Sequence, residues 1–509
     1  MRPRNPAVPR RLAASLLLLP LLTGCFAAGS GSADPAAGDG GSGSGARLRV
    51  AMAFPPAERM SPYGDDGVLL SRLAVTEGLT SLDTDGAAAP ALAASWKRDG
   101  DRDWTFTLRQ AAFQDGTEVT AENAAAALRR ATEADPAPRA LSGVDLQVEA
   151  AGPRTLRITT AAPDPILPQR LANPSLAVLS PKAYGADGRV DPAGHATGPF
   201  TLTRLDGTRS ATLQRFDRYW GSGAEAAGID VQFVADGTAR ANALRSGAVD
   251  VAEAVPVAQV PLLADGTARE VPTVRTSGLY LNTRKGAFKD PALRAAARAA
   301  IRPAELARGV YEGHADPGQG LFGPAVAWAE GKRVQPTGRA RPAEADTVHG
   351  RSIVLATYSN RPELPETAAV LQQQLRKAGF TVRLEVREYS RIESDALAGA
   401  FDAFILPRAA LLDTGDPVSF LASDFTCGSS FNLAQLCDKT VDAAVASAAA
   451  IGSTGARQDA VMRAEAAVLA TDAMVPLVHQ RVVQGVAAGV RGVLLDPYER
   501  TLVGTGTHR

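Results

Sequence analysis

Cysteine is scarce in this chain of 509 residues, and histidine is hardly more common. The three cysteines are never spaced as Cys-x-x-Cys, so the pattern indicates neither a structural zinc site nor a dithiol redox site. The five histidines, at 195, 314, 349, 479 and 508, are not paired at ligand spacing. The sequence therefore predicts no metal site.

The chain also lacks an excess of charge of either sign, and it lacks the common enzyme motifs. Lysine plus arginine equal aspartate plus glutamate, 54 against 54, which argues against a nucleic-acid partner. The chain has no Gly-x-Ser-x-Gly elbow, no His-Glu-x-x-His, no phosphate loop and no dinucleotide-binding glycine pattern. We expect a protein that is not an enzyme and that needs no cofactor.

No apolar run after Cys25 is long enough to span a bilayer, but the N-terminus has the layout of an export signal. Four arginines precede an apolar segment at 12–22, and the segment ends in Leu-Thr-Gly-Cys, which resembles a bacterial lipobox. We predict a lipoprotein signal peptide at 1–24, with Cys25 as the lipidated residue. An ordinary signal peptide that contains a cysteine is the alternative.

Residues 25–46 are mostly glycine, serine, alanine, aspartate and proline, a composition that cannot bury enough apolar surface to fold. This segment is predicted to be a flexible tether that holds the folded part near the membrane. The expected location is extracytoplasmic, on the outer face of the cell membrane, equivalent to a periplasmic space.

Cys427 and Cys437 remain once Cys25 is assigned to the lipid. A pair of cysteines in an exported chain predicts a disulfide. Two free buried thiols are the alternative.

Strand and helix patterns alternate along the rest of the chain, which favours an α/β fold. Residues 48–52 and 229–234 read as strands, and residues 103–109 alternate with a period of two. Thr120 is placed to cap a helix at 121–131. The clearest unit is a strand near 353–356, a helix at 366–378 and a strand at 381–386. We expect a βαβ crossover there, with its two strands parallel.

Several short blocks together resemble the extracytoplasmic substrate-binding proteins of ABC importers of the peptide, opine and nickel class, family 5. The blocks cover most of the mature chain in the order found in the family: 77–79, 90–96, 104–109, 113–117, 120–123, 197–200, 279–283, 371–380, 415–417 and 475–479. Arg302 stands where the family usually has an acid.

The resemblance implies an α/β, two-lobed periplasmic-binding-protein fold of class II, with an extra subdomain and a two-segment hinge. The first lobe is expected at 47–281 and 476–509, with the extra subdomain at about 77–197, and the second lobe at 282–475. The expected hinge residues are Asn282, Thr283, Val475 and Pro476. Closure of the lobes around the ligand is the mechanism that this fold implies.

In the dipeptide-binding branch, an aspartate just before Gly-Asp-Pro pairs with the ligand ammonium, and an arginine before a proline holds its carboxylate. Asp413 and Arg361 stand at those positions. Either could instead be an ordinary loop residue, and Asp416 is expected to be a turn residue. Tyr358, Tyr280 and Trp220 are candidate walls of side-chain pockets, although a position in the core is the favoured interpretation for each.

The resemblance thus implies a monomeric, lipid-anchored binding protein for a small solute, with a di- or oligopeptide as the favoured ligand. Its partners would be an ABC permease and ATPase. A nickel or metal chelate held by the same fold is one alternative, and a sensory or adhesive lipoprotein is another.

Overall fold

The computed structural model describes residues 45–135, 137–141 and 144–509 of the chain. The predicted signal peptide, the predicted lipidation site Cys25 and nearly all of the predicted tether lie outside these residues. All elements below belong to one compact unit.

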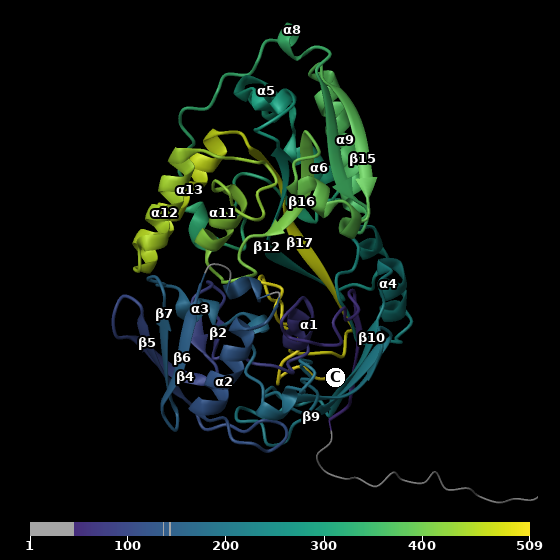
Figure 1. The fold of residues 1–509 in the computed structure, drawn as a ribbon. Coiled ribbons are helices and arrows are strands. Elements are labelled where there is room, and N and C mark those ends of the chain that lie inside the picture. The colour runs from purple at the N-terminus through teal and green to yellow at the C-terminus, as the bar shows by residue number, and fades with distance from the viewer. Residues whose placement is uncertain (1–44, 136, 142–143) are drawn as a thin grey trace, which may run out of the picture. The chain divides into compact units, whose positions relative to one another are not determined.

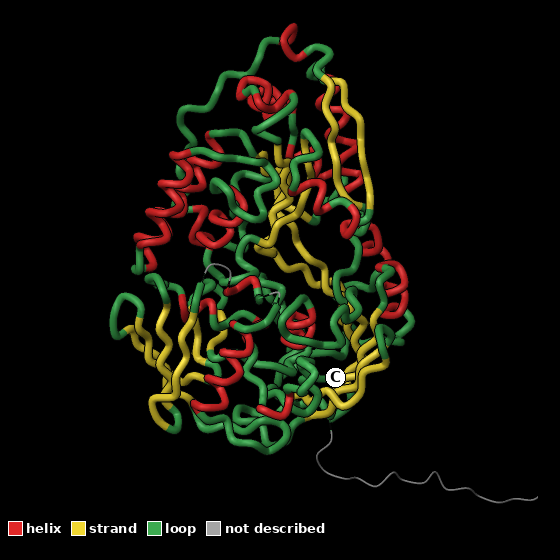
Figure 2. Tube along the Cα trace, in the orientation of Figure 1, coloured by secondary structure: helices red, strands yellow, loops and turns green. Residues whose placement is uncertain are grey.

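One mixed sheet of eleven strands runs through this unit (Figures 1 and 2). Its order is β15-β14-β16-β12-β17-β11-β1-β10-β9-β8, with β13 paired to β17. The strands are β1 (Leu48–Met52), β8 (Phe200–Asp206), β9 (Ser210–Arg215), β10 (Gly228–Phe233), β11 (Val251–Ala252), β12 (Ala268–Leu281), β13 (Ala315–Pro317), β14 (Ser352–Tyr358), β15 (Thr381–Arg387), β16 (Ala403–Ala409) and β17 (Met474–Val486).

The first lobe is built on β1, β8, β9, β10 and β11, together with the end of the chain. Its core joins residues of these strands to Val486, Val490, Leu502 and Val503. A first-lobe core can include the C-terminal residues because β17 runs back from the second lobe. Its helices are α1 (Asp66–Arg72), α4 (Gly237–Arg245) and the 3-10 helix η4 (Val257–Leu262).

A subdomain with its own core follows α1. Its antiparallel sheet has the order β4-β5-β7-β6, and helix α2 packs on β6 and β7. Thr120 caps α2 as predicted, because its Oγ1 accepts a hydrogen bond from the Asn123 amide. The elements are β2 (Thr80–Leu82), β3 (Ala88–Pro90), β4 (Ala93–Arg98), β5 (Asp103–Leu108), α2 (Ala121–Thr132), η1 (Arg139–Leu141), β6 (Leu146–Gly152), β7 (Thr155–Thr160), α3 (Leu167–Arg170), η2 (Pro174–Leu176) and η3 (Pro181–Ala183).

The second lobe contains the predicted βαβ unit. Strands β14 and β15 pair in parallel, and α9 packs against both, which confirms the crossover. Gly379 ends α9 with a φ of 106°, a backbone conformation that suits glycine. The other elements are η5 (Ala287–Lys289), α5 (Pro291–Ala300), α6 (Pro303–Gly309), α7 (Ala327–Glu330), α8 (Ala345–Val348), α9 (Glu363–Lys377), η6 (Tyr389–Arg391), α10 (Glu393–Leu397), α11 (Pro417–Phe425), α12 (Lys439–Ala450) and α13 (Thr454–Ala470).

Strands β12 and β17 connect the two lobes as an antiparallel pair (Figure 1). Their register shifts between Pro272 and Thr276, and the second-lobe core begins at Val274. Asn282 and Thr283 lie beyond this point. Asn282 Nδ2 donates to the Gly399 and Phe401 carbonyls, and Thr283 Oγ1 donates to the Ala434 and Gln435 carbonyls.

Val475 and Pro476 pair with β12 on the same second-lobe side of the shift. The hinge role of these residues and the exact lobe boundaries stay predictions. Separately, no helix among the described residues has the length and hydropathy needed to cross a membrane.

Candidate functional site

Asp413 lies in the loop between β16 and α11, and its carboxylate is largely uncommitted. Its nearest cation is Arg408, at 3.8 Å, and the side chain is 28% exposed. Among the described residues, no hydrogen bond ends on either carboxylate oxygen. The side chain lines a cavity of about 470 Å³. Asp413 can therefore accept a ligand cation without first breaking a close ion pair.

Arg408 is already neutralised by another acid. Its Nε and Nη2 donate to Asp424 over 3.0 and 3.3 Å, and its guanidinium lies 4.7 Å from the ring centre of Phe431. Burial opposes the charge of Arg408, but Asp424 outweighs burial and raises the pKa of Arg408. Because Asp424 neutralises this arginine, Asp413 keeps its own charge available.

Arg361 lies between the end of β14 and the start of α9. The nearest carboxylate oxygen among the described residues belongs to Glu363, 3.8 Å away, and the side chain is 27% exposed. Burial alone would lower the pKa of Arg361, but Tyr358, Glu363 and Glu499 together raise it. Arg361 is thus a charged guanidinium without a close carboxylate partner, which suits the binding of a ligand carboxylate.

The two candidate tyrosines lie in different surroundings. Tyr358 is buried beside Arg361 and contacts Tyr389 edge to face, with ring centres 4.9 Å apart. Tyr280 is 1% exposed and stacks on Phe425 in the second-lobe core. Tyr358 can therefore form a wall of a pocket beside Arg361. Tyr280 instead lies in the core, which was the position that the sequence favoured for it.

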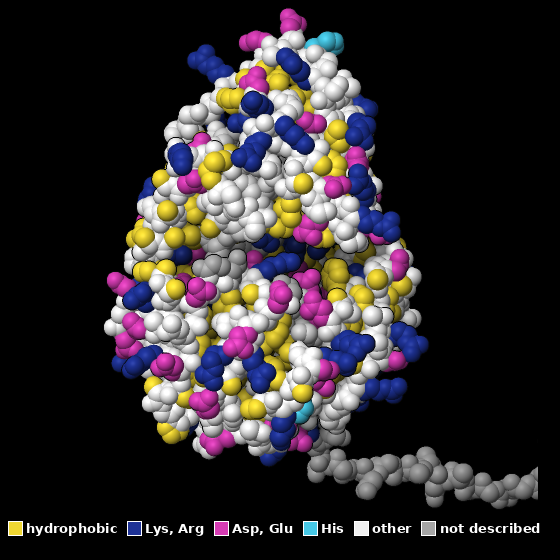
Figure 3. All heavy atoms as spheres, viewed as in Figure 1, with side chains coloured by type: hydrophobic (Ala, Val, Ile, Leu, Met, Phe, Trp, Pro, Cys, Tyr) yellow, Lys and Arg dark blue, Asp and Glu magenta, His cyan; other side chains and the backbone are white. Residues whose placement is uncertain are grey.

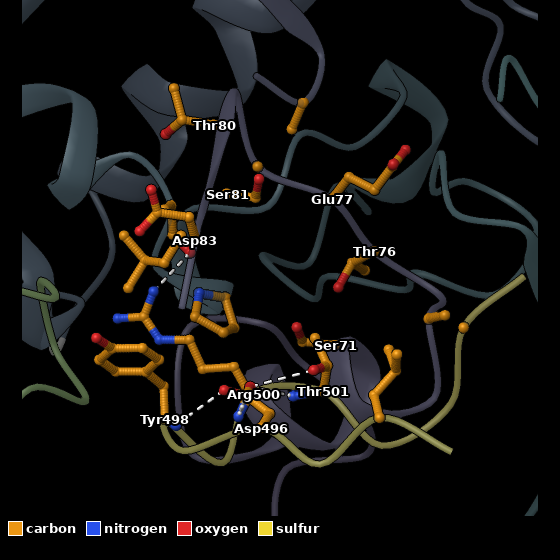
Figure 4. A pocket seen from close by; sticks show the side chains of 18 of the residues that line it. Ser71, Thr76, Glu77, Thr80, Ser81, Asp83, Asp496, Tyr498, Arg500 and Thr501 are labelled. Atoms are coloured by element: carbon orange, nitrogen blue, oxygen red, sulfur yellow. Dashed lines mark hydrogen bonds between the residues drawn. The ribbon is translucent and has the colours of Figure 1, made fainter. Parts of the chain in front are cut away.

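Trp220 lines a different cavity, of about 540 Å³, in the first lobe (Figure 4). Its Nε1 donates to Glu77 Oε2 over 2.9 Å, and the neighbouring Tyr219 hydroxyl donates to Oε1 over 2.8 Å. Arg109 lies over the indole, 3.8 Å from the ring centre. Burial raises the pKa of Glu77 even though these donors and Arg109 act in the opposite direction.

The loop at 496–501 interacts both with the segment that carries Asp413 and with Arg361. Arg500 Nη2 donates to the carbonyl of Leu412, the residue before Asp413, over 2.5 Å. The adjacent Glu499 stabilises the charge of Arg361. This loop thus interacts electrostatically with Arg361 through Glu499, and it bonds the segment of Asp413 through the Leu412 carbonyl. Trp220 lines the first-lobe cavity that this loop also lines, whereas Tyr280 lies in the second-lobe core.

Glu499 is held by two further arginines. Arg275 Nε donates to its carboxylate over 3.1 Å, and Arg72 Nε donates to its main-chain carbonyl over 2.7 Å. Burial opposes ionisation, but Arg275, Arg72 and Arg361 lower the pKa of Glu499. In the space-filling view, basic and acidic side chains lie together in a groove across the displayed face (Figure 3).

Asp416 and the two cysteines behave as expected from the sequence. Asp416 caps α11 by accepting from the Val418 amide, and it also receives two hydrogen bonds from Arg457. Cys427 and Cys437 form a disulfide that closes a loop after α11. Both features organise the chain that follows Asp413.

Metal-ligating side chains do not gather in the part of the chain that the structure describes. Among the described residues, no group of three or more His, Cys, Asp and Glu side chains could hold an ion. His479 is buried in β17, and its Nδ1 lies 2.9 Å from Thr276 Oγ1. Burial lowers the pKa of His479 to about 4.

Sequence reasoning missed Asn173, Glu499 and Arg500 as site residues. Each contacts its partners across 80 residues or more. Glu77 was noticed only as part of a family block. The signal that could have drawn attention to the C-terminal loop was its charge, Asp-Pro-Tyr-Glu-Arg at 496–500, in an otherwise apolar neighbourhood.

The sequence of this chain is similar to sequences of known binding proteins. The glutathione-binding protein GsiB of Salmonella typhi is 29% identical over 345 residues, which are 64% of this chain and 66% of the relative. The chain thus spans just under two thirds of that relative's length.

Two solved structures share the fold. One is NikA from Staphylococcus aureus in complex with Ni(L-His)2, with a TM-score of 0.75, 21% identity, and coverage of 91% of this chain and all of that one. The other is DppA from Helicobacter pylori in complex with the peptide STSA, with a TM-score of 0.74, 20% identity, and coverage of 90% and 98%. Both confirm the predicted two-lobed α/β fold.

Residues 87–432 match the family described as bacterial extracellular solute-binding proteins, family 5 Middle. The match covers more than half of the chain and includes the loop of Asp413, the Arg361 position and the disulfide residue Cys427. It identifies a binding protein for a solute outside the cytoplasm rather than an enzyme. This chain belongs to the family 5 extracellular solute-binding proteins.

Proposed function

We propose that this protein is the lipid-anchored substrate-binding subunit of an ABC importer and that it captures a short peptide. The observation that carries the peptide assignment is the pair of uncommitted charges in the second lobe. Asp413 and Arg361 each have their nearest opposite charge 3.8 Å away. A free peptide presents an ammonium and a carboxylate, so it can neutralise both groups in one binding event.

Burial of the ligand explains why Asp413 and Arg361 would select peptides by their terminal groups. A peptide enclosed between two lobes loses the water around its termini, and an unpaired terminus there costs several kcal/mol. Peptides with both termini free should therefore bind better than blocked ones. The relative named for glutathione and the neighbour bound to a tetrapeptide are consistent with a peptide-like solute.

The binding step is closure of the lobes around the ligand. A ligand that contacts both lobes stabilises the closed form by its difference in affinity for the two forms. The first lobe supplies the 496–501 loop, and the second supplies Asp413 and Arg361. The closed form would then be recognised by a permease with its ATPase, and the binding protein would act as a monomer.

Titration calorimetry with trialanine, N-acetyl-trialanine and trialanine amide tests the peptide assignment. We expect each blocked terminus to weaken binding by more than tenfold. Asp413→Asn should remove the preference for a free amine, and Arg361→Gln the preference for a free carboxylate. Asp265→Asn and Arg308→Gln, both at exposed positions, are the matched controls.

Two results would contradict this assignment. Equal affinity of the wild type for acetylated and free peptide would remove Asp413 from the site. A rise in melting temperature with nickel–histidine, without any rise for di- to pentapeptides, would indicate a metal chelate as the ligand instead.

The lipid anchor has its own test. Palmitate should label the wild type in a bacterial host, and Cys25→Ser should abolish labelling and release the protein from the membrane. Retention of the Cys25→Ser variant in the membrane fraction would reject the anchor.

A further inference from the structure

The cavity lined by Trp220 extends from the end of α1 to the 496–501 loop (Figure 4). Its volume of about 540 Å³ is within the range of small-molecule pockets, roughly 300–1,000 Å³. Neither Asp413 nor Arg361 lines it. The proposed peptide-terminus contacts therefore leave its walls unexplained.

Arg500 lines this cavity as a buried cation without a close counter-ion. The residue is 5% exposed, and its two terminal nitrogens donate to the carbonyls of Ala172 and Leu412. Its Nε has no hydrogen-bond partner among the described residues, and no carboxylate there forms an ion pair with it. A buried charge of this kind is costly unless an anion joins it.

The two nearest acids only partly offset this cost. Burial lowers the pKa of Arg500 to about 10, and Asp496 and Asp413 act in the opposite direction. Arg500 is therefore charged at neutral pH. Asp496 directs its oxygens to the amides of Tyr498, Arg500 and Thr501 in its own turn, so its acceptor capacity is already in use.

Hydroxyl groups complete the set of donors around the cavity. Thr76 is 7% exposed, and its Oγ1 is buried without a partner among the described residues. Figure 4 shows Thr76 and Ser71 on the walls of the same open space as the Arg500 side chain. A buried hydroxyl without a partner has lost its bonds to water, and a ligand acceptor would restore one.

The remaining acids on the walls already accept hydrogen bonds from the protein. Asp83 accepts hydrogen bonds from the Asp85 and Ala87 amides of its own turn. Glu77 is held by Tyr219 and Trp220. Among the described residues that line the cavity, the buried polar side-chain atoms without a hydrogen-bond partner are Arg500 Nε and Thr76 Oγ1, and both can donate to an anion.

We propose that this cavity receives a second carboxylate of the ligand, with Arg500 as its counter-ion and Thr76 as a further donor. This inference rests on the proposed function. It specifies the substrate class as acidic peptides, which carry a carboxylate in addition to the terminal groups that Asp413 and Arg361 bind.

Three matched pairs of tripeptides test the inference. Each pair places Glu or Gln in an otherwise all-alanine tripeptide, at position 1, 2 or 3, so the test does not depend on the binding register. For at least one pair, we expect the wild type to bind the Glu peptide at least tenfold more tightly. In Arg500→Gln this ratio should fall to about one, and in Thr76→Val it should fall about threefold.

The ratio separates anion binding from a merely structural role of Arg500. If Arg500 only joins Ala172 to Leu412, its substitution weakens both members of a pair equally, and the ratio stays at the wild-type value. That result would overturn the inference. Thr76→Val is nearly isosteric and keeps the test valid if Arg500→Gln does not fold. Thr84→Val, at an exposed position on the rim, is its control and should leave the ratio unchanged.

The outcomes for the two proposals differ. Equal binding of Glu and Gln peptides by the wild type would overturn the inference and leave the proposed function standing. If no peptide of any pair binds, the proposed function fails, and the inference fails with it.

Discussion

The side-chain amide of Asn173 donates a hydrogen bond of 2.5 Å to the main-chain carbonyl of Asp413. The donor belongs to the subdomain, and the acceptor belongs to the second-lobe loop that carries the proposed ammonium site. Arg500 reinforces this contact, because it bonds the carbonyls of the two preceding residues, Ala172 and Leu412. The main chain that carries the Asp413 carboxylate is thus held by a contact between the lobes.

Asn173→Asp should weaken peptide binding without unfolding the protein. The aspartate can still accept the hydrogen bonds from the Ser175 amide and hydroxyl that Asn173 Oδ1 accepts now. It loses the donor to Asp413 and places a negative charge against a carbonyl. Loss of one such bond is worth about 1 kcal/mol, so calorimetry should show a three- to tenfold weaker affinity.

The matched control is Asn123→Asp. Asn123 Nδ2 also donates to a carbonyl, that of Glu118, but this bond is exposed and stays within the subdomain. We expect the affinity of Asn123→Asp for peptide to equal that of the wild type. Wild-type affinity in Asn173→Asp as well would show that the contact between the lobes does not contribute to binding.

Gly415 is expected to be intolerant of any side chain. Its φ is +69°, and a β-carbon there would lie 2.7 Å from Leu82 Cδ1 and 3.2 Å from the Gly86 carbonyl. The β2–β3 hairpin would have to move away from the Asp413 loop. Gly415→Ala should therefore reduce peptide affinity more than tenfold in a calorimetric titration.

Gly188→Ala is the control that introduces backbone strain without the contact that a β-carbon at Gly415 would make with Leu82 and Gly86. Gly188 has a φ of +79°, but nothing lies within 4 Å of the position that a β-carbon would occupy there. Urea denaturation should show a loss of about 1 kcal/mol in stability, and the affinity should not change. Equal effects of the two variants on affinity would mean that strain alone accounts for the loss at Gly415.

Local patterns predicted the elements well because their causes are local. Thr120 and its helix are neighbours in sequence, and the βαβ unit needs only alternating hydrophobicity and a short connection. The contacts around the site are different. Asn173 lies 240 residues from Asp413, and Arg500 lies 88 residues from Leu412. No periodicity or cap records such pairings, so the sequence could nominate Asp413 but not the residues that hold its loop.

The disulfide should contribute to stability chiefly through the unfolded chain. Cys427 and Cys437 are ten residues apart, and closing so short a loop stabilises the folded state by about 3 kcal/mol in the chain-entropy description. Urea denaturation with and without a phosphine reductant should show this difference. A Cys427→Ser/Cys437→Ser variant should be insensitive to the reductant. If reduction leaves the wild-type midpoint unchanged, the loop is already constrained without the bond.

His479 should make the protein less stable in mild acid. Burial lowers its pKa from an ordinary 6.5 to about 4, with Arg333 acting in the same direction and Asp316 opposing. Between those two values the unfolded chain binds a proton that the folded chain does not, so stability falls as the pH decreases from 6.5 to 4. The largest loss from this residue is on the order of 3 kcal/mol.

His479→Gln removes this titration, and comparison with the wild type isolates it from every other acid-sensitive group. At pH 7 the variant should be the less stable protein, because the ring packs in the core and bonds Thr276. That deficit should shrink in urea denaturations at pH 6, 5 and 4, while His349→Gln, at an exposed position, should follow the wild type throughout. A deficit that stays constant with pH would mean that His479 does not resist protonation. His479 would then not be the cause of any loss of stability that the protein shows in mild acid.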